Sequence, residues 1–450
     1  MEEFMQKMKK AKDLDDILGA FESIPLEVQD LSEFYAETME SRTGDASASP
    51  LDIIKEHCLK VRPRNAAHLL LGHKGCGKST ELNKLKERLQ IVGYTVETVH
   101  CRDIIGIEGG TPWDIMILIT DGLLNIADKK GIKLDKGLVD DIKRMLETTE
   151  VQVTERSIGV SAGAGAQIGV SLPLRPVINL LAAIKGDAAA SYERRDTIHT
   201  QVQRRASDWK RLIDQISDEI TKGLKNKRPI LIFEDLDKMT DLQKALSIFT
   251  YQTLAQMNFP IIYTCPIELY YRPEFTPLGG YYRTQKKLPM IKINKLDGTP
   301  CTEGQKTILG IILKRADEEL FEQEALLLII EKTGGVLRNV FQMIIDAGGR
   351  ARRRGATKIE MQDANAALKG LKTDLKSRIE EKDYAPLADI YNDQKKRRQI
   401  TDREFLLKML QASVLLEYNG EGWHDLHPLI ADFLCEQGYI TKLRNARIDG

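Results

Sequence analysis

Short apolar runs alternate with longer stretches of helical periodicity along this chain. The stretch 81–89 repeats leucine at helical spacing, and a capping box at Thr111 opens an apolar helix that continues to residue 126. Residues 94–100 alternate between apolar and polar positions as a strand does. Apolar runs bounded by polar residues predict buried strands at 68–71, 230–233 and 259–263. This alternation predicts an α/β fold with a parallel sheet.

Helical patterns dominate the chain after these strands. They cover 308–320, 323–332 and 337–354, and a fourth helix ends near Leu368, which predicts a compact helical lid. A helix at 401–410 then precedes two strand-like segments around an Asn-Gly pair at 419–420, which is a strong hairpin signal. Helices followed by one such hairpin predict a C-terminal winged helix.

These patterns divide the chain into six expected parts. The part at 151–206 is an insertion with a glycine-rich stretch at 157–171. We expect this stretch to be a hairpin or flap that becomes ordered only against another surface, and the alternative is a loop without a partner. The six parts are an N-terminal helical arm and linker (1–50), the first half of the core (51–150), the insertion (151–206), the second half of the core (207–298), the lid (299–370) and the winged helix (371–450).

Composition narrows the class of protein. The 450 residues carry 66 basic and 66 acidic side chains, so the formal net charge is zero. The chain therefore lacks the overall positive charge typical of nucleic-acid-binding proteins, and any contact with nucleic acid must come from a local basic patch. The six cysteines form no C-x-x-C pair and have no metal-ligand spacing. The N-terminus lacks a signal-peptide pattern and no run of about 18 apolar residues occurs. We therefore expect a cytoplasmic protein that has no membrane association.

The segment 72–79, Gly-His-Lys-Gly-Cys-Gly-Lys-Ser, fits the phosphate-loop pattern G-x-x-x-x-G-K-[ST] between a predicted strand and a predicted helix. In this pattern Lys78 reaches the β/γ oxygens of a nucleoside triphosphate and Ser79 offers its hydroxyl to Mg²⁺. The alternative is a glycine-rich turn without a ligand. The residues expected to contact the nucleotide are Gly72, His73, Lys74, Gly75, Cys76, Gly77, Lys78, Ser79 and Thr80.

Hydrolysis also needs acidic groups, and carboxylates follow the strand 230–233 at Glu234, Asp235 and Asp237. The carboxyl end of a central parallel strand delivers side chains to the ligand crevice. We assign Glu234 to the Mg²⁺ ion and Asp235 to the attacking water, with the reverse assignment left open. The alternative is a solvated acidic loop after a core strand.

The order of these motifs resembles the AAA+ ATPases of the origin-recognition and Cdc6-like branch, and the related STAND ATPases, over residues 51–450. The resemblance implies ATP and Mg²⁺ as ligands, Thr264 as a first sensor of the γ-phosphate and Arg338, after Gly334-Gly335, as a second sensor on the lid. Alternatively, Thr264 caps a turn, and Arg338 is an ordinary surface arginine after a helix-breaking Gly-Gly pair. The Glu-Asp order and the long insertion depart from the AAA+ pattern. No arginine finger is assigned, and Arg272 and Arg283 are the nearest candidates.

The stretches 72–82 and 233–238 also resemble a group of bacterial P-loop ATPases linked to anti-phage systems. We therefore expect an ATP-driven switch that forms homo-oligomers and works with an effector protein. One alternative is a DNA-bound initiator or loader that contacts nucleic acid through its basic run, and another is a nucleotide-binding scaffold with negligible turnover. The basic run consists of Lys395, Lys396, Arg397 and Arg398.

Overall fold

The computed structural model describes residues 8–45, 47, 49–60, 66–102, 110–154, 206–418 and 422–441. For residues 146–154 it describes the backbone but not the side chains. The glycine-rich stretch 157–171 lies outside the described residues. The chain forms two compact units, each built from separate stretches of sequence. We call them the lid unit (Met1–Asp52, Gly72–Lys84 and Lys287–Gly450) and the sheet unit (Ile53–Leu71 and Leu85–Lys286).

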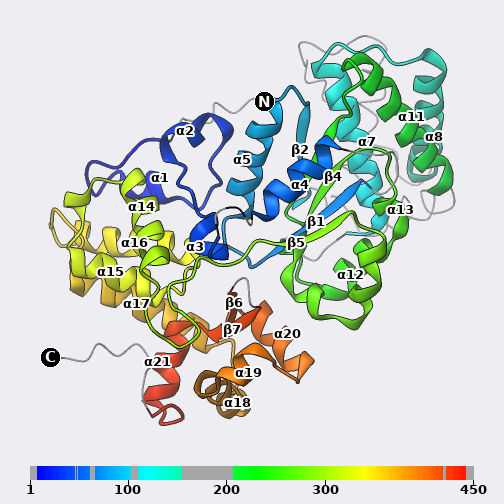
Figure 1. The fold of residues 1–450 in the computed structure, drawn as a ribbon. Helices are drawn as coiled ribbons and strands as arrows, with labels where there is room; N and C mark the ends of the chain where they lie inside the picture. The colour runs from blue at the N-terminus through cyan, green and yellow to red at the C-terminus, as the bar shows by residue number, and fades with distance from the viewer. Residues whose placement is uncertain are drawn as a thin grey trace. The chain divides into compact units, whose positions relative to one another are not determined.

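A five-stranded sheet organises the sheet unit (Figure 1). Its strands are β1 (Ala67–Gly72), β2 (Val96–His100), β3 (Ile230–Glu234), β4 (Ile261–Pro266) and β5 (Thr284–Lys287), in the order β2-β3-β4-β1-β5. β3 pairs in parallel with β2 and with β4, so Phe233 lies beside both Val99 and Tyr263. β1, β3 and β4 are buried along their whole length, as their apolar runs predict. The predicted α/β fold with a parallel sheet is confirmed.

Long amphipathic and apolar helices cover this sheet. α7 begins at the predicted capping box of Thr111 and Asp114, and twelve of its eighteen residues are buried. α11 packs against α7 and α8 and turns one apolar face inward. The helices assigned mainly to this unit are α4 (Pro50–Leu59), α7 (Pro112–Lys129), α8 (Lys136–Thr154), α11 (Ala206–Gly223), α12 (Leu242–Thr250) and α13 (Gln252–Ala255).

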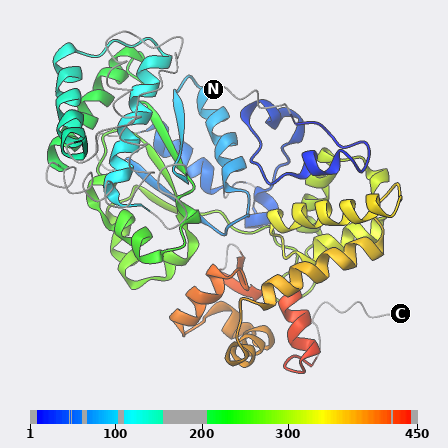
Figure 2. The same ribbon diagram turned by 180° about the vertical axis from the view of Figure 1, so that it is seen from behind.

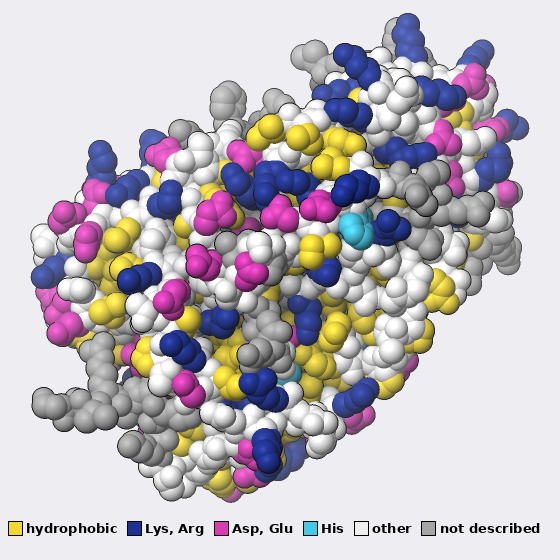
Figure 3. Space-filling model, in the orientation of Figure 1, with side chains coloured by type: hydrophobic (Ala, Val, Ile, Leu, Met, Phe, Trp, Pro, Cys, Tyr) yellow, Lys and Arg dark blue, Asp and Glu magenta, His cyan; other side chains and the backbone are white. Residues whose placement is uncertain are grey.

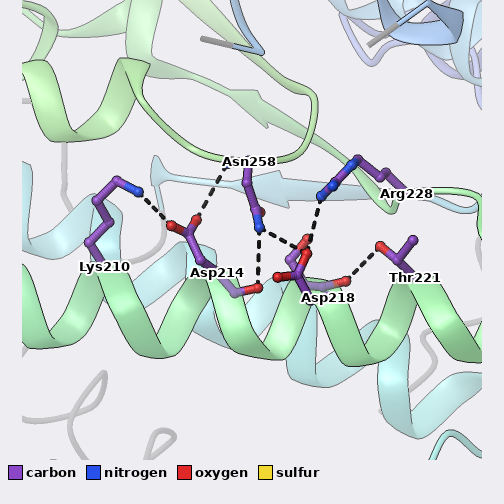
Figure 4. A network of polar contacts seen from close by, with 7 residues as sticks. Lys210, Asp214, Asp218, Thr221, Arg228 and Asn258 are labelled. Carbon is purple, nitrogen blue, oxygen red and sulfur yellow. Dashed lines mark hydrogen bonds and ion pairs between the residues drawn. The ribbon is translucent and has the colours of Figure 1, made fainter. Parts of the chain in front are cut away.

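Polar contacts attach the exposed side of α11 to the turns before β3 and β4 (Figure 4). Asn258 donates through Nδ2 to the carbonyl oxygen of Asp214 (3.4 Å) and to Oδ1 of Asp218 (3.0 Å). Arg228 pairs with Asp218 at 3.4 Å, and Lys210 pairs with Asp214 one helical turn away. These contacts hold α11 in register with the strands that follow it.

Four helices form the predicted helical lid in the lid unit (Figure 2). They are α14 (Thr302–Arg315), α15 (Gln323–Lys332), α16 (Leu337–Arg353) and α17 (Met361–Lys376). α16 and α17 pack along each other, and Arg354 joins them by a two-point contact with the Asp363 carboxylate at 3.1 and 2.8 Å.

The C-terminal part of the lid unit is a set of helices with one antiparallel hairpin, as a winged helix requires. Glu417 faces His424 across the hairpin. The elements are α18 (Glu381–Asn392), α19 (Gln394–Arg398), α20 (Arg403–Gln411), β6 (Leu415–Tyr418), β7 (Trp423–Leu426) and α21 (Pro428–Glu436).

The N-terminal arm packs on the lid helices through short elements. Phe21 meets the Phe341 ring of α16 edge-on at 5.7 Å, and buried Arg315 donates to the carbonyl oxygen of Ala20 at 2.9 Å. The arm contains α1 (Ile17–Phe21), α2 (Leu31–Phe34) and α3 (Met39–Thr43). It therefore belongs to the same compact unit as the lid.

The surface carries both signs of charge. Lys and Arg side chains are interspersed with Asp and Glu on the face shown in Figure 3, in keeping with the zero net charge. Within the described residues, no helix has the length and apolar character needed to cross a bilayer.

Candidate nucleotide-binding site

The predicted phosphate loop follows β1 directly and ends where α5 (Lys78–Ile91) begins. Gly75 and Gly77 have φ angles of 80° and 100°, values that glycine adopts at little cost. Lys78 is buried, and its Nζ donates to the carbonyl oxygens of Gly72 and His73, both at 2.7 Å. The ammonium group therefore lies inside the loop, directly at the N-terminus of a helix.

This arrangement has the chemical properties of an anion site. The first amides of a helix point along its axis without intrahelical acceptors, and the helix dipole adds positive potential at that end. Ser79 is half-buried at the second residue of α5. The neighbouring Thr80 uses its hydroxyl differently, because Oγ1 accepts a hydrogen bond from the amide of Leu26 at 3.3 Å. Lys78, the helix amides and Ser79 fit a polyphosphate with its metal ion.

The lid contacts the loop through its backbone. The amide of Arg338, the predicted second sensor, donates to the carbonyl oxygen of Gly75 at 3.2 Å. A Cβ atom at Gly75 would lie 2.8 Å from the Cβ atom of Arg338. The Arg338 side chain itself is exposed. The structure therefore brings this predicted residue to the loop.

The C-terminal hairpin contacts the loop through His73. The amide of Glu417 in β6 donates to Nε2 of His73 at 2.7 Å, so Nδ1 carries the imidazole proton. Burial, followed by the charge of Lys78 and those of His424 and Lys287, lowers the pKa of His73 to about 3. His73 is therefore neutral near pH 7 and acts as a hydrogen-bond acceptor.

The predicted acidic residues lie at the end of β3 in the sheet unit. Glu234 is 3% exposed, and its carbonyl oxygen accepts from the amide of Cys101 at 3.2 Å. Asp235 follows with φ of 73°, a left-handed conformation that Asp tolerates better than most residues.

The Asp235 carboxylate pairs with two basic side chains. Oδ1 accepts from Nζ of Lys238, and Oδ2 lies 3.8 Å from Nδ1 of His100. Although burial raises the pKa of Asp235, the hydrogen bonds and charges of His100 and Lys238 outweigh this and lower it to about 2. The carboxylate is therefore ionised at neutral pH.

Thr264 lies in β4 beside the end of β3. Its hydroxyl donates to the carbonyl oxygen of Phe233 at 3.2 Å and the residue is 1% exposed. The side chain thus links two neighbouring strands in this state. Its role as a first sensor stays a prediction.

The structure divides the predicted site residues between its two units. The loop residues and Arg338 belong to the lid unit, and Glu234, Asp235 and Thr264 to the sheet unit. Sequence analysis missed Arg42, which donates to the loop carbonyl of Cys76 at 2.7 Å, as well as His100 and Lys238 beside Asp235. No local pattern marks Arg42 as a loop contact, because its loop partner Cys76 lies 34 positions away in the sequence.

The basic run differs from the expectation at one position. Arg397 is 1% exposed and its Nη1 lies 3.9 Å from Oδ2 of Asp425 in β7, so its assignment as a surface contact for nucleic acid is wrong. α19 buries this one side chain of the run against the hairpin. Lys396 pairs with Asp389 at 2.7 Å on the surface, and Lys395 and Arg398 are exposed.

Comparison with solved structures gives weak likenesses. The Aeropyrum pernix ORC2 protein in its ADP form is 12% identical, with a TM-score of 0.40, over 94% of this chain and 98% of that one. The A. pernix ORC1 protein in complex with DNA is 13% identical, with a TM-score of 0.34, over 87% and 92%. The Thermotoga maritima RuvB Holliday junction branch migration motor is 10% identical, with a TM-score of 0.32, over 88% and 98%.

No family model matches the sequence, and no curated protein matches it.

Proposed function

We propose that this chain is a P-loop ATPase that binds and hydrolyses ATP with Mg²⁺ and works as a molecular switch. The observation that carries the proposal is the loop itself. Its sequence fits the phosphate-loop pattern, Gly75 and Gly77 have left-handed φ angles, and buried Lys78 lies at the start of α5. Each of these features suits the binding of a triphosphate.

The proposed roles follow from residue chemistry. Lys78 would neutralise the β/γ oxygens, and Ser79 and Glu234 would hold a Mg²⁺ ion, which would supply electrostatic stabilisation of the phosphates. Asp235, kept ionised by His100 and Lys238, orients the attacking water.

The contacts of the loop support a switch. The lid reaches the Gly75 carbonyl through the amide of Arg338, and the C-terminal hairpin reaches His73 through the amide of Glu417. A ligand that reshapes the loop therefore acts on both parts at once. The equilibrium between two arrangements of the lid and the hairpin shifts on nucleotide binding only as far as the nucleotide binds one arrangement more tightly than the other.

We place this switch in a homo-oligomer that regulates an effector protein in a bacterial anti-phage system. This finer role is supported by the motif resemblance at 72–82 and 233–238. The alternative is an origin-recognition-like DNA-binding ATPase. Exposed Lys395 and Arg398 on the winged helix favour it, because exposed cations contact DNA phosphates.

Nucleotide titration of Lys78→Ala tests the central proposal. We expect the variant to weaken binding of an ATP analogue by about 10- to 150-fold, the worth of one hydrogen bond to a charged group. Lys86→Ala is the matched control, because Lys86 lies in the same helix and donates to Thr98 at 3.2 Å. Equal affinities for wild type and Lys78→Ala would refute the nucleotide site.

Phosphate release separates a hydrolysing switch from a scaffold. Asp235→Asn is expected to retain ATP and stop phosphate release, whereas continued release would move the water-orienting role to Glu234 or Asp237. Wild type that binds ATP without release would identify a scaffold. Salt-dependent DNA affinity that falls in Lys395→Gln/Arg398→Gln would favour the DNA-binding alternative.

A further inference from the structure

A buried arginine from the N-terminal arm contacts the outer side of the phosphate loop. Arg42 is 1% exposed, and Nη2 donates to the carbonyl oxygen of Cys76 at 2.7 Å. Nε donates to Oγ1 of Thr38 at 2.8 Å, and Nη1 donates to the carbonyl oxygen of Pro289. A Cβ atom at Gly77 would lie 3.4 Å from Nη2. The guanidinium group therefore lies directly behind the Cys76–Gly77 peptide.

Peptide geometry gives this contact a consequence for the inside of the loop. In a trans peptide the carbonyl and the amide of the next residue point in opposite directions. A carbonyl of Cys76 held toward Arg42 therefore turns the amide of Gly77 away from Arg42, into the concave side of the loop. That is the direction in which a phosphate oxygen needs a donor.

Other contacts of the arm hold Arg42 in place. The Glu81 carboxylate of α5 accepts from Thr38 Oγ1 at 2.6 Å and from the Tyr35 hydroxyl at 3.0 Å. Farther along α5, Asn83 donates through Nδ2 to the carbonyl oxygen of Leu26 at 2.9 Å. The arm thus follows the first two turns of α5.

Packing alone does not account for a charged group here. Burial of a guanidinium costs free energy unless its donors are satisfied, and an apolar side chain would fill the same volume without that cost. A planar fork with donors in fixed directions suits the simultaneous orientation of separate carbonyls. The contacts with Cys76 and Pro289 use it in this way.

We propose that Arg42 is a positioning residue of the phosphate loop, which fixes the Cys76–Gly77 peptide so that the Gly77 amide donates to the polyphosphate of the bound nucleotide. This inference rests on the proposed nucleotide binding. It gives the N-terminal arm a part in phosphate recognition that acts through the backbone of the loop.

Calorimetric titration with an ATP analogue tests the proposal in the full chain. Arg42→Lys keeps the charge and loses the fork, so its Kd is expected to rise at least tenfold at unchanged binding stoichiometry. A purely structural role would instead lower the stoichiometry, because a misfolded fraction binds nothing. In Arg42→Ala, added guanidinium is expected to restore part of the affinity.

The control is Arg352→Gln. Arg352 also joins the lid to the arm, through Asp15 at 2.8 Å, but it is a surface residue outside the loop. Its Kd is expected to match wild type. If neither Arg42 variant folds, Thr38→Val decides, since it keeps Arg42 but removes the hydroxyl that accepts from Nε and donates to Glu81, and it is expected to raise the Kd severalfold.

The outcomes separate the two proposals. Wild type that binds no nucleotide ends the proposed function and this inference together. If wild type binds the nucleotide and Arg42→Lys binds it with the same affinity, the inference alone is overturned. If neither Arg42 variant folds, an unchanged Kd in Thr38→Val overturns it in the same way. A raised Kd that guanidinium lowers again in Arg42→Ala supports the inference.

Discussion

Substitution of Gly75 by alanine tests the geometry of the phosphate loop most directly. Gly75 has φ of 80° and its carbonyl oxygen accepts the Arg338 amide at 3.2 Å. An added Cβ atom would lie 2.8 Å from the Cβ atom of Arg338. Gly75→Ala therefore combines backbone strain with a steric conflict against an atom fixed to the start of α16.

The magnitude follows from these two causes. A left-handed conformation costs an alanine about 1 to 2 kcal/mol. Overpacking of a close contact adds about 1 to 3 kcal/mol. Withdrawal of the loop to avoid the conflict loses the bond to Arg338, worth about 0.5 to 1.5 kcal/mol. We expect the variant to lose about 2 to 5 kcal/mol from the free energy of unfolding of the lid unit.

Gly355 provides a matched control at the end of α16. Its φ is 77°, and an added Cβ atom meets nothing within 4 Å. Gly355→Ala should therefore lose only the strain of about 1 to 2 kcal/mol. Denaturant unfolding measures both variants, and titration with an ATP analogue should show at least tenfold weaker binding for Gly75→Ala and unchanged binding for Gly355→Ala.

Equal destabilisation of the two variants would refute the close contact between Gly75 and Arg338. Unchanged nucleotide affinity in Gly75→Ala would refute the assignment of this loop as the binding site. The two readouts are independent, so each part of the reasoning is tested separately.

Two further predictions concern the winged helix. Burial, followed by the charge of Arg378, lowers the pKa of His427 to about 3, so the unfolded chain gains a proton near pH 6.5 that the folded chain excludes. The free energy of unfolding therefore falls as the pH falls from about 6.5 toward 3. When denaturant unfolding is measured across this range, the plot of unfolding free energy against pH should be flatter for His427→Asn than for wild type, by up to about 1.4 kcal/mol per pH unit. The same slope in both proteins would contradict the prediction. Arg397→Gln should lower the unfolding free energy by about 3 kcal/mol because its positive charge lies buried near Asp425, while Lys395→Gln should change it by less than about 0.5 kcal/mol, and equal effects would argue against the burial of Arg397.

Local pattern predicted those elements whose residues carry their own signal. The helix predicted at 323–332 is α15, and the helix predicted at 337–354 is α16, which begins at the same residue and ends at Arg353. The capping box at Thr111 forms as expected. Helix and strand periods depend on neighbours in sequence, so a single chain is enough to reveal them.

Contacts between residues far apart in the sequence leave no such signal. Arg397 stands in a run of four basic residues, and only the fold shows that its side chain turns inward toward Asp425. Arg42 lies in an arm of short helices, 34 positions before its loop partner Cys76. The pairing of Asp235 with His100 likewise depends on the adjacency of β2 and β3. These side chains acquire their roles from topology.

The hydrogen bond between His73 and Glu417 has a consequence for biosynthesis, since 344 positions separate its two residues. At about 5 to 20 residues per second, a ribosome adds the second partner roughly 20 to 70 s after the first. During that interval the nascent loop lacks the hairpin against which its imidazole is buried. We conclude that the surroundings of the loop are completed only after the hairpin that contains Glu417 has been synthesised.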